Sequence, residues 1–311
     1  MSAGTRLAIV FRGDYSAATA PPFVAARTGL GSFMGFWLLA LMPAAAAAVW
    51  HHGARTLAEI AVSCAASAAV EIVFALVRKR PMVPGVLVPG LALALVLPPG
   101  TPLWMAGLGA AFGTFFGKEV FGGTGHNLFN PAAVGKCFLF LSYPTVMMEA
   151  VRAGAAGPVP AGASLLLGPQ PGGAGEVCAA CILAGALVLV LSRAGSWRTM
   201  LSVELSAGAL SAALWAFAPD RFDPPHAALL SGGLLFGACF LASDPATSPV
   251  SRGGKWIYGA MVGALAVVIR NFSAYNAYSQ GVMFAVLLGN LFAPMIDSAA
   301  LALRSRRAAR A

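Results

Sequence analysis

The sequence has little charge. Only 10% of its 311 residues are Asp, Glu, Lys or Arg, whereas a soluble globular domain carries about 25%. Hydrophobic residues make up 59% of the chain, and the mean hydropathy is +0.79. So few charges cannot cover the water-facing surface of a chain of this length. The composition therefore excludes an ordinary soluble enzyme, a nucleic-acid-binding module and a disordered chain.

Cysteine is also scarce, with five residues that all lie in apolar segments. No disulfide framework is therefore expected. Cys178 and Cys181 form a C-A-A-C pair, but the surrounding run VCAACILAGALVLVL favours packing thiols over a metal or redox pair.

The apolar runs are long and continuous. A membrane-spanning helix needs about 20 apolar residues, whereas barrel strands alternate apolar and polar residues over about ten. The runs therefore predict an all-α polytopic membrane protein with about ten transmembrane helices. The expected spans are 30–50, 57–77, 82–97, 103–117, 131–148, 176–192, 199–217, 227–242, 256–270 and 280–300.

The basic residues are distributed unevenly among the loops. With the N-terminus in the cytoplasm, fifteen Lys and Arg residues fall on the inner side and four on the outer side. Basic loops stay in the cytoplasm. We therefore expect a multi-pass protein of a bacterial-type inner (cytoplasmic) membrane, with both termini in the cytoplasm and without nucleic acid as a partner.

Ten spans divide into two halves of five, and an odd number of spans gives the halves opposite orientations. LPPGTPLW (97–104) resembles SDPATSPV (243–250), and NLFNPAAVGK (127–136) corresponds in place to SAYNAYSQG (273–281). These matches predict two inverted five-helix repeats with irregular breaks around a central site; the alternative is ordinary turns. The expected parts are a cytoplasmic segment 1–28, a first membrane half 29–150, an outer loop 151–175, a second membrane half 176–300 and a basic cytoplasmic tail 301–311.

A glycine-rich stretch, FGKEVFGGTGHNLFNPAAVGK (116–136), is the first candidate site. Its glycines allow positive φ angles and a close approach of the backbone, and its hydroxyl and amide side chains lie beside them. Such a loop can hold a flat aromatic ring. The candidate ring-binding residues are Gly122, Gly123, Thr124, Gly125, Asn127 and Asn130.

The second candidate stretch is LASDPATSPVSRGGKWIYG (241–259). Asp244 directly follows an apolar run, where a carboxylate either caps a helix or handles a cation or proton. Thr247 and Ser248 could add oxygens, and oxygen ligands suit a hard cation such as Na⁺. Glu119, at the end of an apolar helix, is the third candidate for ion or proton handling. Glu71 is expected to pair with a neighbouring helix, because an unpaired acid is costly in hydrocarbon.

These stretches resemble one known family. GKEVFGGTGHNLFNPAAVGKCFLFLSYP (117–144) and SGGLLFGACFLASDPATSPVSRGGKWIYG (231–259) are similar to the B subunit of the Na⁺-translocating NADH:quinone reductase and to the D subunit of the Rnf electron-transport complex. The similarity extends over about residues 70–297. The resemblance implies ten spans in two inverted halves. It also implies a non-autonomous membrane subunit of a multi-subunit complex that carries electrons through flavin and helps to translocate Na⁺ or H⁺.

The resemblance further implies FMN joined through its phosphate to a Thr in an S-G-A-T motif, riboflavin in some members, and quinone near the GGTG region. Here the corresponding loop offers only A-G-A-S (161–164), so Ser164 would be the covalent FMN acceptor, and Pro158 replaces an Asp. The segment YNAYSQG (275–281) also departs from the family text NPAYPEG. Two alternatives stay open: a flavin-free transporter or channel of the same fold, and a structural subunit with a decayed flavin site.

Overall fold

A computed structural model of the chain describes residues 30–79, 85–154, 166, 172–230, 233–272 and 280–308. All regular elements within these ranges are helices, which confirms the predicted all-α fold. A helix lies at each of the ten positions expected for a span. Ser164 falls outside the described residues, as do 273–279 of the SAYNAYSQG segment.

The first half contains α2 (Leu30–His52), α3 (Ala54–Arg78), α4 (Val88–Val96), α5 (Leu103–Thr114), the π-helix η1 (Phe115–Glu119), α6 (Pro131–Ser142) and α7 (Pro144–Gly154). The second half contains the 3₁₀ turn η2 (Ala174–Glu176), α9 (Ala179–Leu191), α10 (Trp197–Phe217), α11 (Pro225–Leu230), α12 (Leu234–Phe236), the π-helix η3 (Gly237–Leu241), α13 (Arg252–Phe272) and α14 (Gln280–Ala308).

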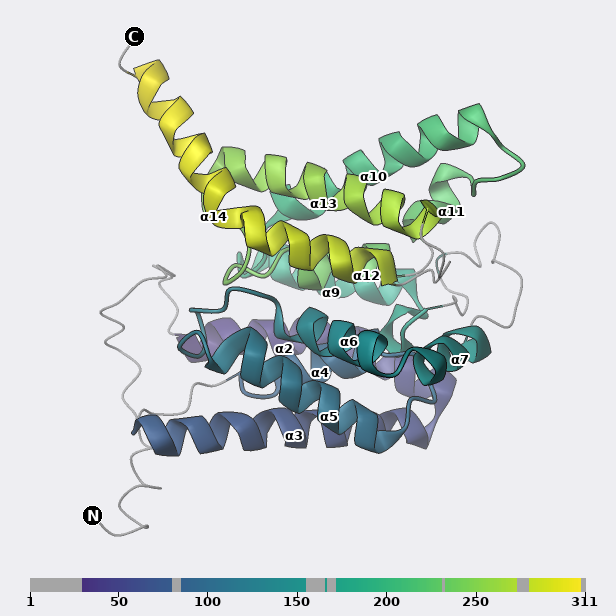
Figure 1. Cartoon of the computed structure of the whole chain (residues 1–311), viewed down its shortest axis with the longest axis vertical. Helices are drawn as coiled ribbons and strands as arrows, with labels where there is room; N and C mark the ends of the chain where they lie inside the picture. Colours follow the sequence, from purple (N-terminus) through teal and green to yellow (C-terminus); the bar gives the residue numbers. More distant parts are fainter. Residues whose placement is uncertain are drawn as a thin grey trace.

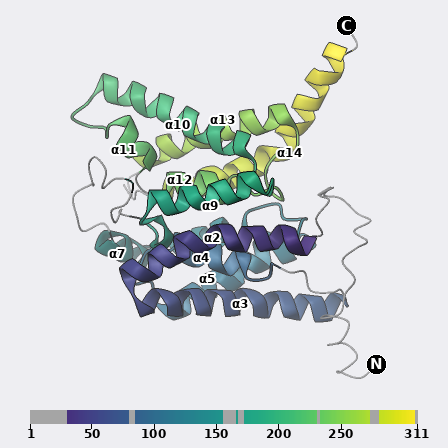
Figure 2. The same cartoon turned by 180° about the vertical axis from the view of Figure 1, so that it is seen from behind.

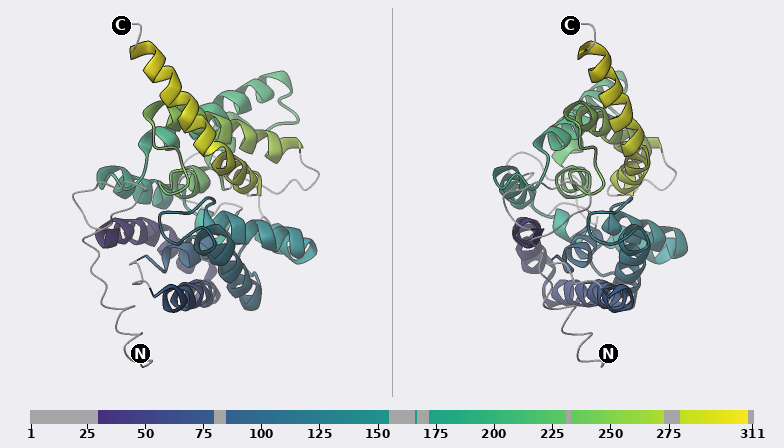
Figure 3. Two further views of the ribbon diagram at one scale, coloured as in Figure 1. Left: turned by 60° about the vertical axis from the view of Figure 1, so that its left-hand side comes forward. Right: turned by 90° about the vertical axis from the view of Figure 1, so that its left-hand side faces the viewer.

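The two halves form two layers along the long axis of the molecule (Figure 1). α2 belongs to the first layer and α9 to the second. The two helices pack side by side where the layers meet, as views from both sides show (Figures 1 and 2). α6 also contacts α14. Seen from the side, most helices are viewed along their axes (right panel of Figure 3). The axes therefore share one direction, as those of spans crossing one membrane must.

Helix α3 has its polarity reversed relative to a helix in water. Apolar side chains such as Leu57 and Val77 are 56% and 73% exposed, while all the residues that α3 buries are polar. A surface helix of a soluble protein buries its apolar stripe instead. The outward apolar surface therefore fits a lipid environment.

By length and composition, four helices of the described chain are able to cross a membrane: α2, α3, α10 and α14. The pair α6 and α7 would make a fifth, but the two helices meet at 110°. The span expected over 131–148 is thus broken at Tyr143, because the residue before Pro144 disfavours the helical conformation and adopts φ −130° and ψ 54°. The span expected over 227–242 is likewise divided into α11, α12 and η3.

Close contact between α5 and α6 depends on a glycine. A Cβ atom at Gly113 would collide with the backbone carbonyl of Pro131 and lie 2.9 Å from the backbone nitrogen of Gly135. Backbone atoms cannot move aside as a flexible side chain can. The contact fixes the start of α6 and therefore the loop before it, which forms the candidate site.

We expect Gly113→Ala to lower the free energy of unfolding by about 1–3 kcal/mol, because it overpacks this contact. The measurement is an SDS unfolding titration of the detergent-solubilised protein. Gly35→Ala in α2 is the matched control. No atom of the described residues lies within 4 Å of the place that its Cβ would take, so the change should stabilise the helix by up to about 1 kcal/mol. Equal effects of the two changes would contradict the predicted role of Gly113.

Candidate functional site

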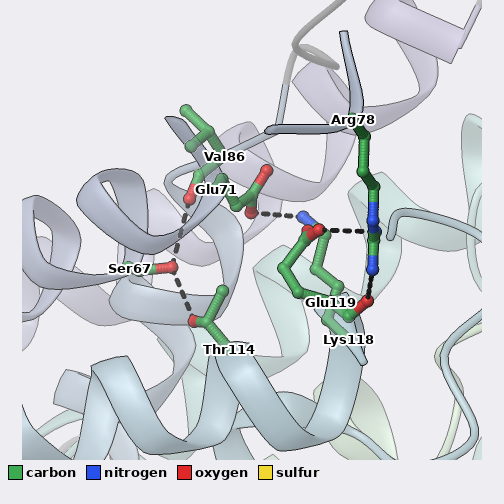
Figure 4. A network of polar contacts seen from close by, with 7 residues as sticks. All are labelled: Ser67, Glu71, Arg78, Val86, Thr114, Lys118 and Glu119. Atoms are coloured by element: carbon green, nitrogen blue, oxygen red, sulfur yellow. Dashed lines mark hydrogen bonds and ion pairs between the residues drawn. The ribbon is translucent and has the colours of Figure 1, made fainter. Parts of the chain in front are cut away.

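A buried ion pair joins the π-helix η1 to α3. Lys118 donates to the Glu71 carboxylate, and both side chains are almost fully buried (Figure 4). The pair confirms the expectation that Glu71 finds a partner on another helix. π-helical turns are rare and occur mostly at functional sites. Here the turn directs the side chains of Lys118 and its neighbour Glu119 to separate partners.

Glu119 is held by Arg78, which stands at the last residue of α3. The guanidinium Nη1 donates to Glu119 Oε2 at 3.1 Å, and Nη2 donates to the Glu119 backbone carbonyl. Deeper along α3, Ser67 shares a hydrogen bond of 2.9 Å with Thr114 and donates to the Val86 carbonyl. Figure 4 shows the resulting network, which connects α3, the end of α5 and η1.

The glycine-rich loop follows directly. Gly122, Gly123 and Gly125 have φ angles of 127°, 92° and 91°, which confirms that glycines are needed here. Gly123 lies against the Glu119–Arg78 pair, because a Cβ atom there would be 3.6 Å from the Glu119 carboxylate. The loop therefore packs on the charged network.

Asn130 connects the two halves. Its Oδ1 accepts hydrogen bonds from the N–H groups of Ala132 and Ala133, which caps α6. Its Nδ2 lies 3.4 Å from the Leu241 carbonyl and 3.5 Å from Asp244 Oδ2. The side-chain amide of Asn290 is best oriented with its oxygen toward Asn130. In that orientation the oxygen accepts a hydrogen bond of 3.0 Å from the backbone N–H of Asn130.

A pocket of about 230 Å³ lies between the loop of the first half and two parts of the second half, the segment 246–249 before α13 and the helix α14. Its lining residues are Asn127, Leu128, Ala246, Thr247, Ser248, Pro249, Asn290, Ala293, Pro294 and Asp297. Asp297 is already engaged, because its carboxylate accepts hydrogen bonds from the N–H groups of Val250 and Ser251.

Three buried polar atoms of this pocket lack a hydrogen-bond partner among the described residues: Asn127 Oδ1, Thr247 Oγ1 and Ser248 Oγ. Buried polar atoms are normally paired, so each unpaired one requires an explanation. Two hydroxyls and an amide around one cavity fit the polar edge of a ring system.

The structure brings together only part of the predicted site. Asn127 and Thr247 line one pocket, and Asn130 contacts Asp244. Asp244 does not cap α13, which begins at residue 252; its Oδ1 accepts from the N–H of Ala246 in a turn. Glu119 belongs to the separate network around Arg78.

Gly122, Gly123, Thr124 and Gly125 do not line the pocket. The sequence singled out Ser248 with Thr247, but not Asn290 as a lining residue, nor Lys118 as the partner of Glu71. Their roles depend on contacts between distant segments. The one signal available was Lys118 itself, a cation at the end of an apolar run that contains no acid.

We expect Lys118→Met to destabilise the protein by about 3–5 kcal/mol, because it leaves the Glu71 charge buried without its partner. Combining it with Glu71→Gln should restore part of that loss, and the two effects should not add. An SDS unfolding titration measures both. Lys79→Met is the control. Lys79 is exposed and lies just beyond the end of α3, so this change should alter the free energy of unfolding by less than about 0.5 kcal/mol. Additive effects at Lys118 and Glu71 would show that the pair contributes nothing.

The sequence matches the model of the NQR2, RnfD, RnfE family over residues 17–303. It is 37% identical over 252 residues to the B subunit of the Na⁺-translocating NADH-quinone reductase of Azotobacter vinelandii. The proteins of the same name from Pseudomonas aeruginosa and Yersinia pestis are 38% and 35% identical. Each alignment covers 73% of this chain and 62% of the relative, so the chain spans about three fifths of the length of these relatives.

These matches confirm the resemblance carried by the EVFGGTG and DPATSP segments. Because the family match covers almost the whole chain and the identity to several members exceeds one third, this chain belongs to the NQR2, RnfD, RnfE family.

Proposed function

We propose that the chain is a membrane subunit of a redox-driven, ion-pumping electron-transport complex, in which it carries electrons through flavin and helps to translocate Na⁺. The observation that carries the proposal is the pocket between Asn127 and Thr247, where three polar atoms have no partner among the residues that the structure describes. The chain belongs to a family whose members include Na⁺-translocating NADH-quinone reductase subunits.

The proposed topology has ten spans in two inverted repeats, with 29–150 and 176–300 as the membrane halves. The order of helix contacts supports it. α3 packs on α5 and α5 on α6, just as α10 packs on α13 and α13 on α14. α2 contacts α4, and α9 contacts α12 and η3. Helices at equivalent places in the two halves therefore have equivalent neighbours.

We place both termini, 1–28 and 301–311, at the cytoplasmic side of a bacterial-type inner membrane, with 151–175 outside. The fifteen-to-four distribution of basic residues supports this orientation. The start of α2 and the end of α14 also lie at one side of the molecule, the left side of Figure 1. Further membrane subunits of the complex would complete the electron path, and we expect no activity from the isolated chain.

The pocket suits a ring rather than a dinucleotide, because its 230 Å³ is below the usual range of about 300–1,000 Å³ for ligand sites. A flavin or quinone ring would supply the redox chemistry. The chain would hold its polar edge with Asn127, Thr247 and Ser248. In this proposal the turn Gly122–Gly125, with Thr124, positions Asn127, and Asn130 keeps the two walls together.

Cation or proton handling is proposed for Glu119, Asp244 and Thr247. Glu119 is buried beside a charge network, and Thr247 has an unpartnered hydroxyl among the described residues. Asp244 places a carboxylate at the contact between the two halves. Carboxylate and hydroxyl oxygens are the ligands that hard cations prefer.

We expect Thr247→Val to weaken ring binding by about two- to tenfold, because one hydrogen bond of about 0.5–1.5 kcal/mol is lost. The assay is the visible flavin absorbance and the quinone dependence of turnover in the purified complex. Thr145→Val, at an exposed position of α7, is the control. A colourless complex with normal ion transport would instead favour the flavin-free transporter.

Covalent FMN at Ser164 is a separate prediction. After coexpression with a flavin transferase, mass spectrometry should find an FMN-sized adduct on the peptide that contains Ser164, and Ser164→Ala should remove it. If the wild-type peptide carries no adduct, the covalent site is decayed, while the pocket at Asn127 keeps its own test.

A further inference from the structure

The buried face of α3 is a line of polar residues. Its members are Thr56, Glu59, Ser63, Ser67 and Glu71, and we call this line the polar stripe. Steps of three and four residues place them on one side of the helix. With a rise of about 1.5 Å per residue, the stripe covers most of the thickness of a bilayer. Intramembrane acids are rare and usually functional.

The inner half of the stripe is fully paired. Ser67 is bonded to Thr114 and to the Val86 carbonyl, and Glu71 is paired with Lys118. These contacts explain both residues as part of the packing between α3, α5 and η1. They leave the outer half, which contains Glu59 and Ser63, to be explained.

In the described chain the outer half is less completely paired. Ser63 is 0% exposed, and its Oγ has no hydrogen-bond partner among the described residues. Glu59 is 1% exposed, and within the same part of the chain neither of its carboxylate oxygens has a hydrogen-bond partner of ordinary geometry. The groups that face this carboxylate are Arg55, with Nε 3.5 Å from Oε1, and the backbone of Gly100.

Packing does not account for this arrangement. On α10, Ser202 donates to the Trp256 carbonyl at 2.6 Å, and Ser206 donates to the Val203 carbonyl at 3.1 Å. The Ser202 hydroxyl therefore joins α10 to α13, and the Ser206 hydroxyl bonds to the backbone of its own helix. Among the described residues the Ser63 hydroxyl has no such use, although an unpaired buried polar group costs about 1–3 kcal/mol. Within the described chain Glu59 is balanced only by the exposed Arg55 of its own helix and by the backbone of Gly100, so it joins no second helix through a side chain.

We propose that Glu59 and Ser63 form a Na⁺ site at the outer end of the polar stripe, from which the cation leaves to the outer side. This inference rests on the proposed pumping function and on its topology. The carboxylate oxygens and the Ser63 hydroxyl would be ligands of a hard cation.

Arg55 gives the site a means of release. Its side chain is 60% exposed, and it also donates to the Gly100 carbonyl at 2.9 Å. Since Na⁺ and the guanidinium compete for one carboxylate charge, Arg55 pairs with Glu59 when the cation has left. The competition weakens Na⁺ binding at the side where a pump must release it.

The test uses the complete complex in proteoliposomes, with Na⁺ transport and electron transfer measured together. Glu59→Gln and Ser63→Ala should each reduce the Na⁺ transported per electron several-fold while the protein still assembles. Ser206→Ala on α10 is the control and should leave the ratio unchanged. Ser63→Ala removes a hydroxyl that bonds to none of the described residues, so it should fold normally even if Glu59→Gln does not.

Three outcomes would overturn the Na⁺ site. If the wild-type complex pumps Na⁺ and Ser63→Ala, Glu59→Gln and the control all keep the same ratio, Glu59 and Ser63 do not bind the transported ion. If the wild-type complex transfers electrons but moves no cation, the proposed pumping function fails, and this site fails with it. If the variants lose proton transport and not Na⁺ transport, Glu59 and Ser63 lie on an ion path, but the ion that they bind is not Na⁺.

Discussion

The constraint on which this structure depends is that polar groups inside a membrane must find partners within the protein. The chain meets it by turning polar side chains inward and apolar ones outward. Asn130 is the clearest example, because its hydrogen bonds connect both halves. Its side chain bonds to Ala132 of the first half and to Leu241 of the second, and its backbone N–H bonds to Asn290 of the second. Where the constraint is met, the residues hold the fold. Thr247 and Ser63, whose hydroxyls have no hydrogen-bond partner in the described part of the chain, are the residues on which we base the two proposed sites.

The same constraint fixes how the second half begins. Lys136 and Glu176 are 1% and 2% exposed and interact through their opposite charges. Glu176 also accepts a hydrogen bond from the N–H of Gly173 at 2.5 Å, and the Ala174 N–H donates to the Leu97 carbonyl. The entry into the second half is therefore attached to α4 and α6 by groups that lipid could not satisfy.

The sequence predicted the features that depend on local pattern. Each apolar run coincides with a helix or a group of short helices, and the glycines at 122, 123 and 125 predicted positive φ angles. The break at Tyr143 was not predicted, although Pro144, which follows it, is a local signal for such a break. The π-helices and the pairing of Lys118 with Glu71 were not predicted either, because they depend on which helices meet in space. The polar stripe repeats every three or four residues along an apolar helix, but the repeat alone does not tell which of its members find partners on other helices.

The two proposed activities are physically connected. The pocket wall at Asn127 belongs to the loop that leaves η1, and η1 is held to α3 through Arg78 and Lys118. α3 in turn carries the polar stripe to Glu59. A change of charge in the pocket and a cation at the stripe therefore act on one continuous set of contacts. Coupling between them requires an element with two arrangements. The π-helical turn η1 is well placed for that role, since it leads into the loop of the pocket and is joined to α3 by two separate ion pairs.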